Sequence, residues 1–153
     1  MTTMDWETEG KGGDFTVYPE GTYLVCINGY ERVTASTGTP QVRWKASILD
    51  GEFVGKPVTL HTPLTEKSLW KIARLVKACG IDLHGLGKMD TEGKAFNNVL
   101  DKCLRRTVYF VMGISPDNKG RDRNDINEFR LDTDQTVITV DDAEDTPEFL
   151  KET

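Results

Sequence analysis

The chain has 153 residues, a hydrophobic content of 37% and a formal net charge of −6, which fits one soluble globular domain. No apolar run approaches the roughly 20 residues that span a bilayer. The acidic start, MTTMDWETEGKGGDF, lacks the apolar segment of a signal peptide. We therefore expect a cytoplasmic protein with no membrane partner.

Charge is distributed unevenly along the chain. Residues 132–153 hold eight acids and one base, residues 1–20 hold five acids and one base, and residues 21–131 hold 17 Lys or Arg and 12 Asp or Glu. This pattern predicts a flexible acidic arm over 1–20, a folded domain over 21–131 and a disordered acidic tail over 132–153. A basic body is typical of a protein that meets polyanions, and an acidic tail would compete with them or recruit a partner.

Three strands are predicted in the first part of the chain, over 22–33, 41–49 and 57–62. The second has the clearest alternation, because every other residue is apolar from Val42 to Ile48. Arg43 and Lys45 should therefore point away from the core. A loop of small residues, 35–40, joins the first two strands.

Two helices follow. The first has Thr65 as a suitable N-cap and Gly80 at the position of a left-handed C-terminal cap. The second covers about 94–104. Strands are then predicted over 106–114 and 126–131, with a polar loop between them, and 135–140 could add a short strand.

The sequence therefore predicts a mainly β fold with α-helices, in the order three strands, a helical segment and two strands. It is the order of an OB-fold, a five-stranded Greek-key barrel with helices between strands three and four. A ferredoxin-like fold needs a helix after its first strand, and a doubly wound fold needs alternating helices.

OB-folds hold oligonucleotides on the outer face of strands two and three and on the loops between strands one and two and strands four and five. Basic residues gather at those places, so we expect phosphate contacts from Arg43, Lys45, Arg105, Lys119, Arg121 and Arg123. The candidates for base stacking are Tyr30, Phe53 and Tyr109. The alternative is an ordinary solvated surface, and Asp117, Asp122 and Asp125 weaken the positive charge of the second loop.

Nothing in the sequence indicates catalysis, a metal or a cofactor. Cys26, Cys79 and Cys103 are widely spaced and predict buried reduced thiols, and His61 and His84 have no ligand motif around them. Paired acids occur in the tail, where they could not be held for acid–base chemistry. The tail residues predicted to bind a partner are Asp141, Asp142, Asp145, Pro147 and Phe149; a merely solubilising tail is the alternative.

Several segments resemble a family of small phage and prophage proteins, long catalogued only as a domain of unknown function. They are the Ser36-Thr37-Gly38 turn, GEFVGK at 51–56, LTEKSLWK at 64–71 and CGID at 79–82. The resemblance covers about residues 15–131. It implies an OB-fold protein that binds single-stranded DNA in phage replication and recombination. The tail is similar to the acidic, Pro-Phe-bearing end of bacterial single-strand-binding proteins, except that four residues follow Phe149.

Together these observations predict a non-enzymatic, sequence-tolerant single-stranded-DNA-binding protein, located in the host cytoplasm if phage-encoded. Its partners would be single-stranded DNA and, through the tail, a recombinase or replication protein. The alternative is an OB-fold adaptor that recruits a recombinase or inhibits a host protein. A homo-oligomer and a preference for RNA both stay open.

Overall fold

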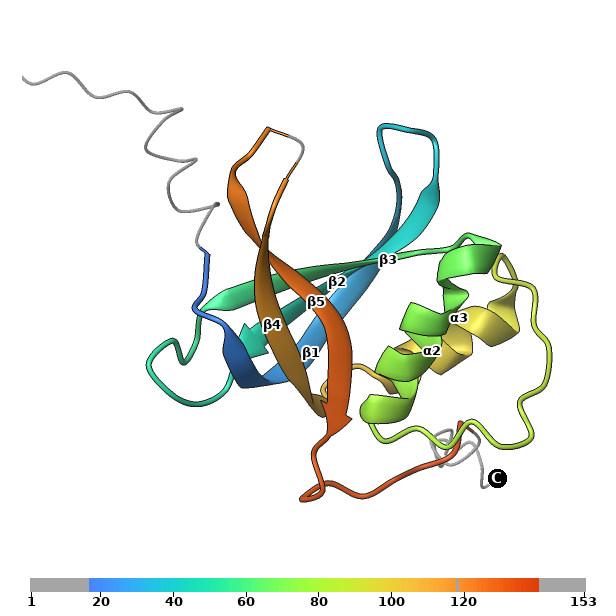
Figure 1. Ribbon diagram of the computed structural model, residues 1–153. Helices are drawn as coiled ribbons and strands as arrows, with labels where there is room; N and C mark the ends of the chain where they lie inside the picture. Colours follow the sequence, from blue (N-terminus) through green and yellow to red (C-terminus); the bar gives the residue numbers. More distant parts are fainter. Residues whose placement is uncertain (1–16, 118, 141–153) are drawn as a thin grey trace, which may run out of the picture.

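The computed structural model describes residues 17–117 and 119–140, which form one antiparallel sheet and two α-helices (Figure 1). The elements in chain order are β1 (Gly21–Thr34), β2 (Pro40–Ile48), β3 (Pro57–Pro63), the 3₁₀ turn η1 (Glu66–Ser68), α2 (Leu69–Ala78), α3 (Lys94–Lys102), β4 (Thr107–Pro116) and β5 (Asp122–Leu131). The order of strands in the sheet is β3-β2-β1-β4-β5.

The central strand, β1, is long enough to pair with two neighbours at different heights. Its first residues, Gly21–Cys26, pair with β4, and the stretch from Val25 to Thr34 pairs with β2. Asn28 has no partner in the β2 register. An extra residue of this kind bends a strand and increases its twist. In Figure 1 the β1–β2 and β4–β5 hairpins project from the same side of the molecule.

The sheet is not closed into a barrel, which corrects part of the fold expected from the sequence. Within residues 17–117 and 119–140, no ladder of hydrogen bonds joins the edge strands β3 and β5. Helix α2 packs against both of these strands and occupies the place where they would otherwise meet. The fold is therefore mainly β, with helices between the third and fourth strands as expected.

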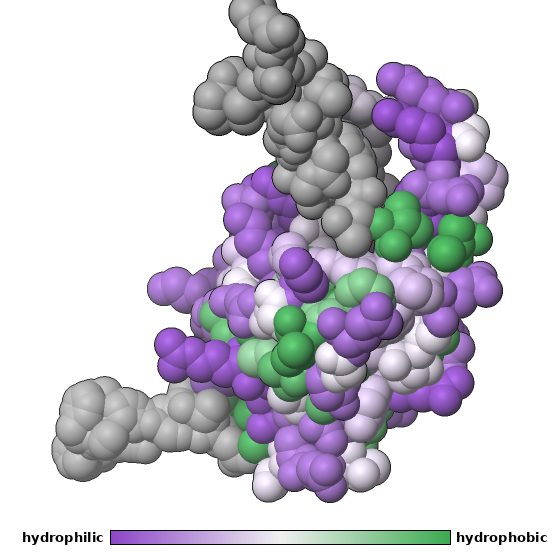
Figure 2. Space-filling view, turned by 90° about the vertical axis from the view of Figure 1, so that its left-hand side faces the viewer, coloured by the Kyte–Doolittle hydropathy of each residue, from purple (hydrophilic) through white to green (hydrophobic). Residues whose placement is uncertain are grey.

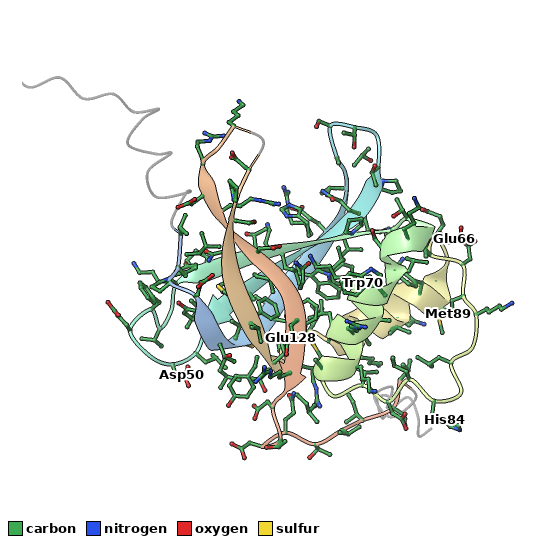
Figure 3. All side chains as sticks on the ribbon, in the orientation of Figure 1. Asp50, Glu66, Trp70, His84, Met89 and Glu128 are labelled. Atoms are coloured by element: carbon green, nitrogen blue, oxygen red, sulfur yellow. The ribbon has the colours of Figure 1, made fainter. Side chains whose placement is uncertain are left out.

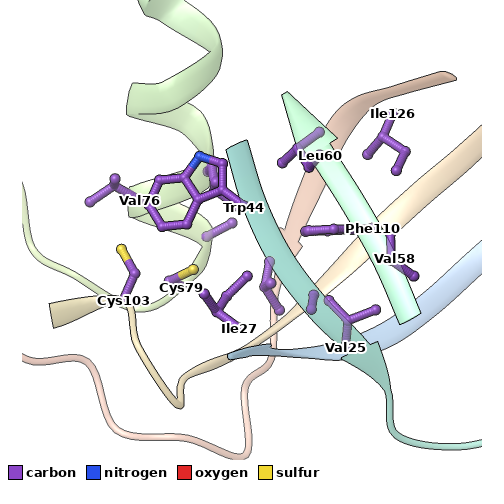
Figure 4. Close-up of a cluster of buried hydrophobic side chains, with 14 of the residues drawn as sticks. Val25, Ile27, Trp44, Val58, Leu60, Val76, Cys79, Cys103, Phe110 and Ile126 are labelled. Atoms are coloured by element: carbon purple, nitrogen blue, oxygen red, sulfur yellow. The ribbon is translucent and has the colours of Figure 1, made fainter. Parts of the chain in front are cut away.

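The core lies between the curled sheet and the two helices. Figure 4 shows the ring of Trp44 pointing from β2 toward the helix that carries Val76. Trp44 is fully buried, and its indole N–H donates to the hydroxyl of Thr62, 3.0 Å away on β3. Burying an aromatic ring with its polar atom paired contributes both area and specificity.

Some boundaries differ from those expected. Strand β5 begins at Asp122 instead of 126, because the residues after the loop pair with the end of β4. Thr65 makes no side-chain cap bond and precedes a 3₁₀ turn, whereas Gly80 has the expected left-handed conformation, with φ of 88°. Within 135–140 the structure has one isolated bridge, between Ile138 and Ile81.

The packed body extends beyond the expected 21–131. Tyr18 is buried in the core, and its backbone exchanges hydrogen bonds with the side chain of Asn124. Ile138 and Val140 pack against the same core.

The face that carries the β2–β3 connection is mostly hydrophilic, with a small apolar area at its centre (Figure 2).

Candidate nucleic-acid interface

The outer face of β2 and β3 lies at the base of the two projecting hairpins (Figure 1). Arg43 and Lys45 alternate with buried neighbours on β2, so their side chains point away from the core, as expected. Across the ladder, Arg43 faces His61 and Lys45 faces Thr59. Both β3 residues are exposed. This face therefore offers two cations, one imidazole and one hydroxyl to a ligand.

Glu31 on β1 reduces the positive charge of this face. Its carboxylate accepts hydrogen bonds from the guanidinium of Arg43, 2.8 Å from Nε, and lies 3.8 Å from the ammonium of Lys45. The hydrogen bond from Arg43 lowers the pKa of Glu31, so this carboxylate is charged at neutral pH. The three residues together carry one net positive charge, which is less than the sequence pattern indicated.

Further positive charge comes from α2 and β5. Burial lowers the pKa of Lys71; the charge of Asp125 raises it and that of Arg123 lowers it. Burial also lowers the pKa of His61, and the charges of Arg43 and Lys71 lower it further. Arg43 and His61 face each other on β2 and β3, and α2, which carries Lys71, packs against both β3 and β5. Arg43, His61, Lys71 and Arg123 therefore form one basic cluster across these elements, with the acid Asp125 beside Lys71.

The β4–β5 hairpin carries three of the basic candidates. Lys119, Arg121 and Arg123 are all exposed there. The carboxylate of Asp117 accepts the backbone N–H groups of Lys119 and Arg121 at 2.8 and 2.9 Å, and also the Arg121 side chain at 3.2 Å. Asp117 thus fixes the shape of the hairpin and neutralises part of its charge.

The structure does not bring Arg105 to the others. It precedes β4, whereas Arg123 pairs with Ser115 near the far end of that strand. At about 3.3 Å per residue, the length of β4 separates the two by roughly 30 Å. Arg105 has a positive φ of 69° and donates its N–H to Ile27.

The three aromatic candidates also lie elsewhere. Tyr30 contacts the ring of Trp44, and its hydroxyl donates to Asp101 of α3 at 2.6 Å. Burial and this hydrogen bond raise the pKa of Tyr30. Phe53 is half-buried in the β2–β3 connection against the ring of Tyr18. Tyr109 is paired with Leu24 and Arg130, two strands away from β2.

Trp70 is an exposed aromatic residue on α2, the helix that carries Lys71 of the basic cluster, and it was not among the stacking candidates expected from the sequence. Trp70 is 44% exposed and lies on the first turn of α2 (Figure 3). The guanidinium carbon of Arg74 lies 4.9 Å from the centre of its ring. The signal was available in the sequence, because helical spacing puts positions 70 and 74 on the face opposite Ile72 and Val76.

The remaining observations concern metal binding, membrane segments, the cysteines and the acidic tail. Among residues 17–117 and 119–140, no cluster of His, Cys, Asp and Glu could hold a metal ion, and no helix is long and apolar enough to cross a membrane. The three cysteines are free; Cys79 and Cys103 are buried and Cys26 is half-buried. The predicted partner-binding residues lie outside the described residues: Asp141, Asp142, Asp145, Pro147 and Phe149.

Comparison with known families gives one match, over residues 4–137, to a family described as "Protein of unknown function (DUF669)". The chain belongs to the DUF669 family. A search of curated proteins finds no match. Membership in DUF669 agrees with the resemblance to a domain of unknown function, and it assigns no activity to the basic cluster.

Proposed function

We propose that this chain binds single-stranded nucleic acid, with little sequence preference, on the outer face of β2 and β3 and on the adjoining surface of α2. The observation that supports the proposal is the basic cluster of Arg43, His61, Lys71 and Arg123. Four elements contribute to it, with the acids Glu31 and Asp125 beside it. Its cations would attract the phosphate groups of a strand, which is the interaction that dominates nucleic-acid affinity.

We also propose a specific fold for this sheet, the OB-fold. In an OB-fold, β1 pairs with β2 and β4, and the barrel closes between β3 and β5. The observed order β3-β2-β1-β4-β5 is that order opened at the last contact. Helix α2 follows β3 in the chain and packs on both free edges. We infer an OB-fold whose helix separates the two edges.

The contacts available on this surface explain why we expect little sequence preference. Arg43, Lys71 and Arg123 would bind phosphate groups, which are the same in every nucleotide. The exposed ring of Trp70 could stack on any base, because every base has a π-face. We propose DNA of phage replication and recombination, in the host cytoplasm, as the biological substrate.

The test is a titration of a fluorescent oligo-dT strand at several salt concentrations. For single strands, log K falls with log salt with a negative slope, whose magnitude decreases by about 0.7 for each phosphate contact removed. Lys71→Ala combined with Arg123→Ala should therefore reduce the magnitude of the slope by about 1.4 and weaken binding at low salt. Oligo-rU in a parallel titration reports any preference between DNA and RNA.

Arg105→Ala and Arg130→Ala serve as matched controls, because both remove an exposed cation outside the cluster. They should leave the slope nearly unchanged. Absence of binding at low salt, or equal losses in the controls and in the double variant, would show that the proposal is wrong. Unaltered strand affinity after Arg121→Glu and Arg123→Glu would favour the protein adaptor instead.

A further inference from the structure

An apolar pocket lies on the helical side of the molecule, and one of its walls is α2, the helix that also carries Lys71 of the basic cluster. Its volume is about 250 Å³, and helices α2 and α3 and the connection between them form its walls. Figure 3 labels Met89, on that connection. The main apolar lining residues are Ile72, Val76, Leu86, Met89, Phe96 and Val99. The pocket is smaller than the roughly 300–1,000 Å³ of small-molecule sites, so it suits one or two large apolar side chains.

The described chain ends close to this pocket. Ile138 is bridged to Ile81, its N–H donating to Gly80 at 2.8 Å and its carbonyl accepting from Asp82 at 2.7 Å. Leu83, which follows Asp82 directly, lines the pocket. The bridge is parallel, so Val140 and Leu83 each lie two residues beyond it. The described chain therefore ends at a fixed point beside one wall of the pocket.

The sequence beyond that point combines acids with an apolar pair. Residues 141–148 contain five acids and no base, and Phe149 and Leu150 come next. Helix α2, which forms one wall of the pocket, carries three bases and no acid. Nine residues from Val140 to Phe149 can span up to about 30 Å, which is ample for a return to the pocket.

We propose that the pocket binds Phe149 and Leu150 of the same chain, with the acids of 141–148 lying along the basic surface of α2. The apolar pair would be removed from water, and the acids would meet opposite charges. The contact is intramolecular, so the fixed start at Val140 raises the local concentration of the pair. This inference does not depend on nucleic-acid binding.

The test compares methyl NMR spectra of the full chain with those of a chain ending at Val140. Docking predicts that the methyl signals of Ile72, Val76 and Val99 differ between the two, while those of Val25 and Val58 in the sheet core coincide. Phe149→Ala with Leu150→Ala in the full chain should move the pocket signals to the truncated positions. Lys151→Ala with Glu152→Ala is the matched control and should leave them in place.

A peptide of residues 141–153, added to the truncated chain, should restore the pocket signals of the full chain. The proposal is overturned if truncation leaves the methyl signals of Ile72, Val76 and Val99 unchanged. It is also overturned if the shifts vanish on dilution together with a fall in sedimentation coefficient, because the occupant would then come from a second copy.

Discussion

Replacing Gly80 tests how strongly Arg106 holds the end of α2 to the segment that contains Thr136. Gly80 has a φ of 88°, and a Cβ there would lie 2.4 Å from Nη2 of Arg106. That guanidinium donates from Nε to the carbonyl of Cys79 at 2.9 Å and from Nη2 to the carbonyl of Thr136. Gly80→Ala must therefore adopt a left-handed conformation and also displace Arg106.

The two costs can be separated. The left-handed conformation costs an alanine about 1 kcal/mol, and loss of one half-buried charged hydrogen bond costs about 1.5 kcal/mol. We expect Gly80→Ala to lower the free energy of unfolding by about 2.5 kcal/mol in urea denaturation. Gly85 has a φ of 84°, and a Cβ added there would have no other atom within 4 Å, so Gly85→Ala should cost only about 1 kcal/mol.

The double variant decides whether Arg106 is the cause. In the Arg106→Ala background the cost of Gly80→Ala should fall to that of Gly85→Ala, because the clash and the hydrogen bond are both gone. Equal costs for Gly80→Ala and Gly85→Ala in the wild-type background would refute the reasoning. So would an unchanged cost of Gly80→Ala when Arg106 is absent.

Three other outcomes are expected. The folded state lowers the pKa of His61, so the unfolded chain binds the proton more readily. The free energy of unfolding should therefore fall as pH drops through about 6.5. His61→Gln should reduce this fall, as measured by urea denaturation at about pH 7 and about pH 5. Thr62→Val leaves the Trp44 N–H unpaired in the core and should cost about 1–3 kcal/mol, whereas Thr59→Val on the exposed face should stay within about 0.5 kcal/mol. Trp70→Ala should weaken oligo-dT binding about 5- to 100-fold with an unchanged salt slope, while Trp70→Phe retains most of the affinity; equal affinity for Trp70→Ala would exclude stacking.

Local sequence patterns were sufficient to predict most of the strands and helices. Strand β2 was predictable because one face is buried along its length, which fixes an alternation of apolar and polar residues. Gly80 was predictable because a left-handed helix end strongly favours glycine. The open edge between β3 and β5 was not predictable, since it depends on where α2 packs, and no local pattern encodes that position.

The site was harder to predict than the fold, because it depends on which side chains pair across strands. Arg43 and Lys45 were correctly expected on the outer face, but the partner carboxylate of Glu31 is more than ten positions away in the sequence. Tyr30 was a stacking candidate until the structure showed its hydroxyl bonded to Asp101 on α3. Lys71 was seen only as part of a helix, and only the fold brings it to Arg123.

Both proposals involve α2, and this makes them thermodynamically linked. Lys71 of α2 would meet phosphate groups in one case, and the three bases of α2 would meet the acids of 141–148 in the other. If the two ligands compete for these charges, each must weaken the other by the same factor. A chain ending at Val140 should then bind oligo-dT more tightly than the full chain, with the largest difference at low salt. Saturating oligo-dT should shift the pocket methyl signals of the full chain toward those of the truncated one. A gain in affinity on truncation without that shift would mean that the tail repels nucleic acid only by its overall charge, and that the linkage through α2 is wrong.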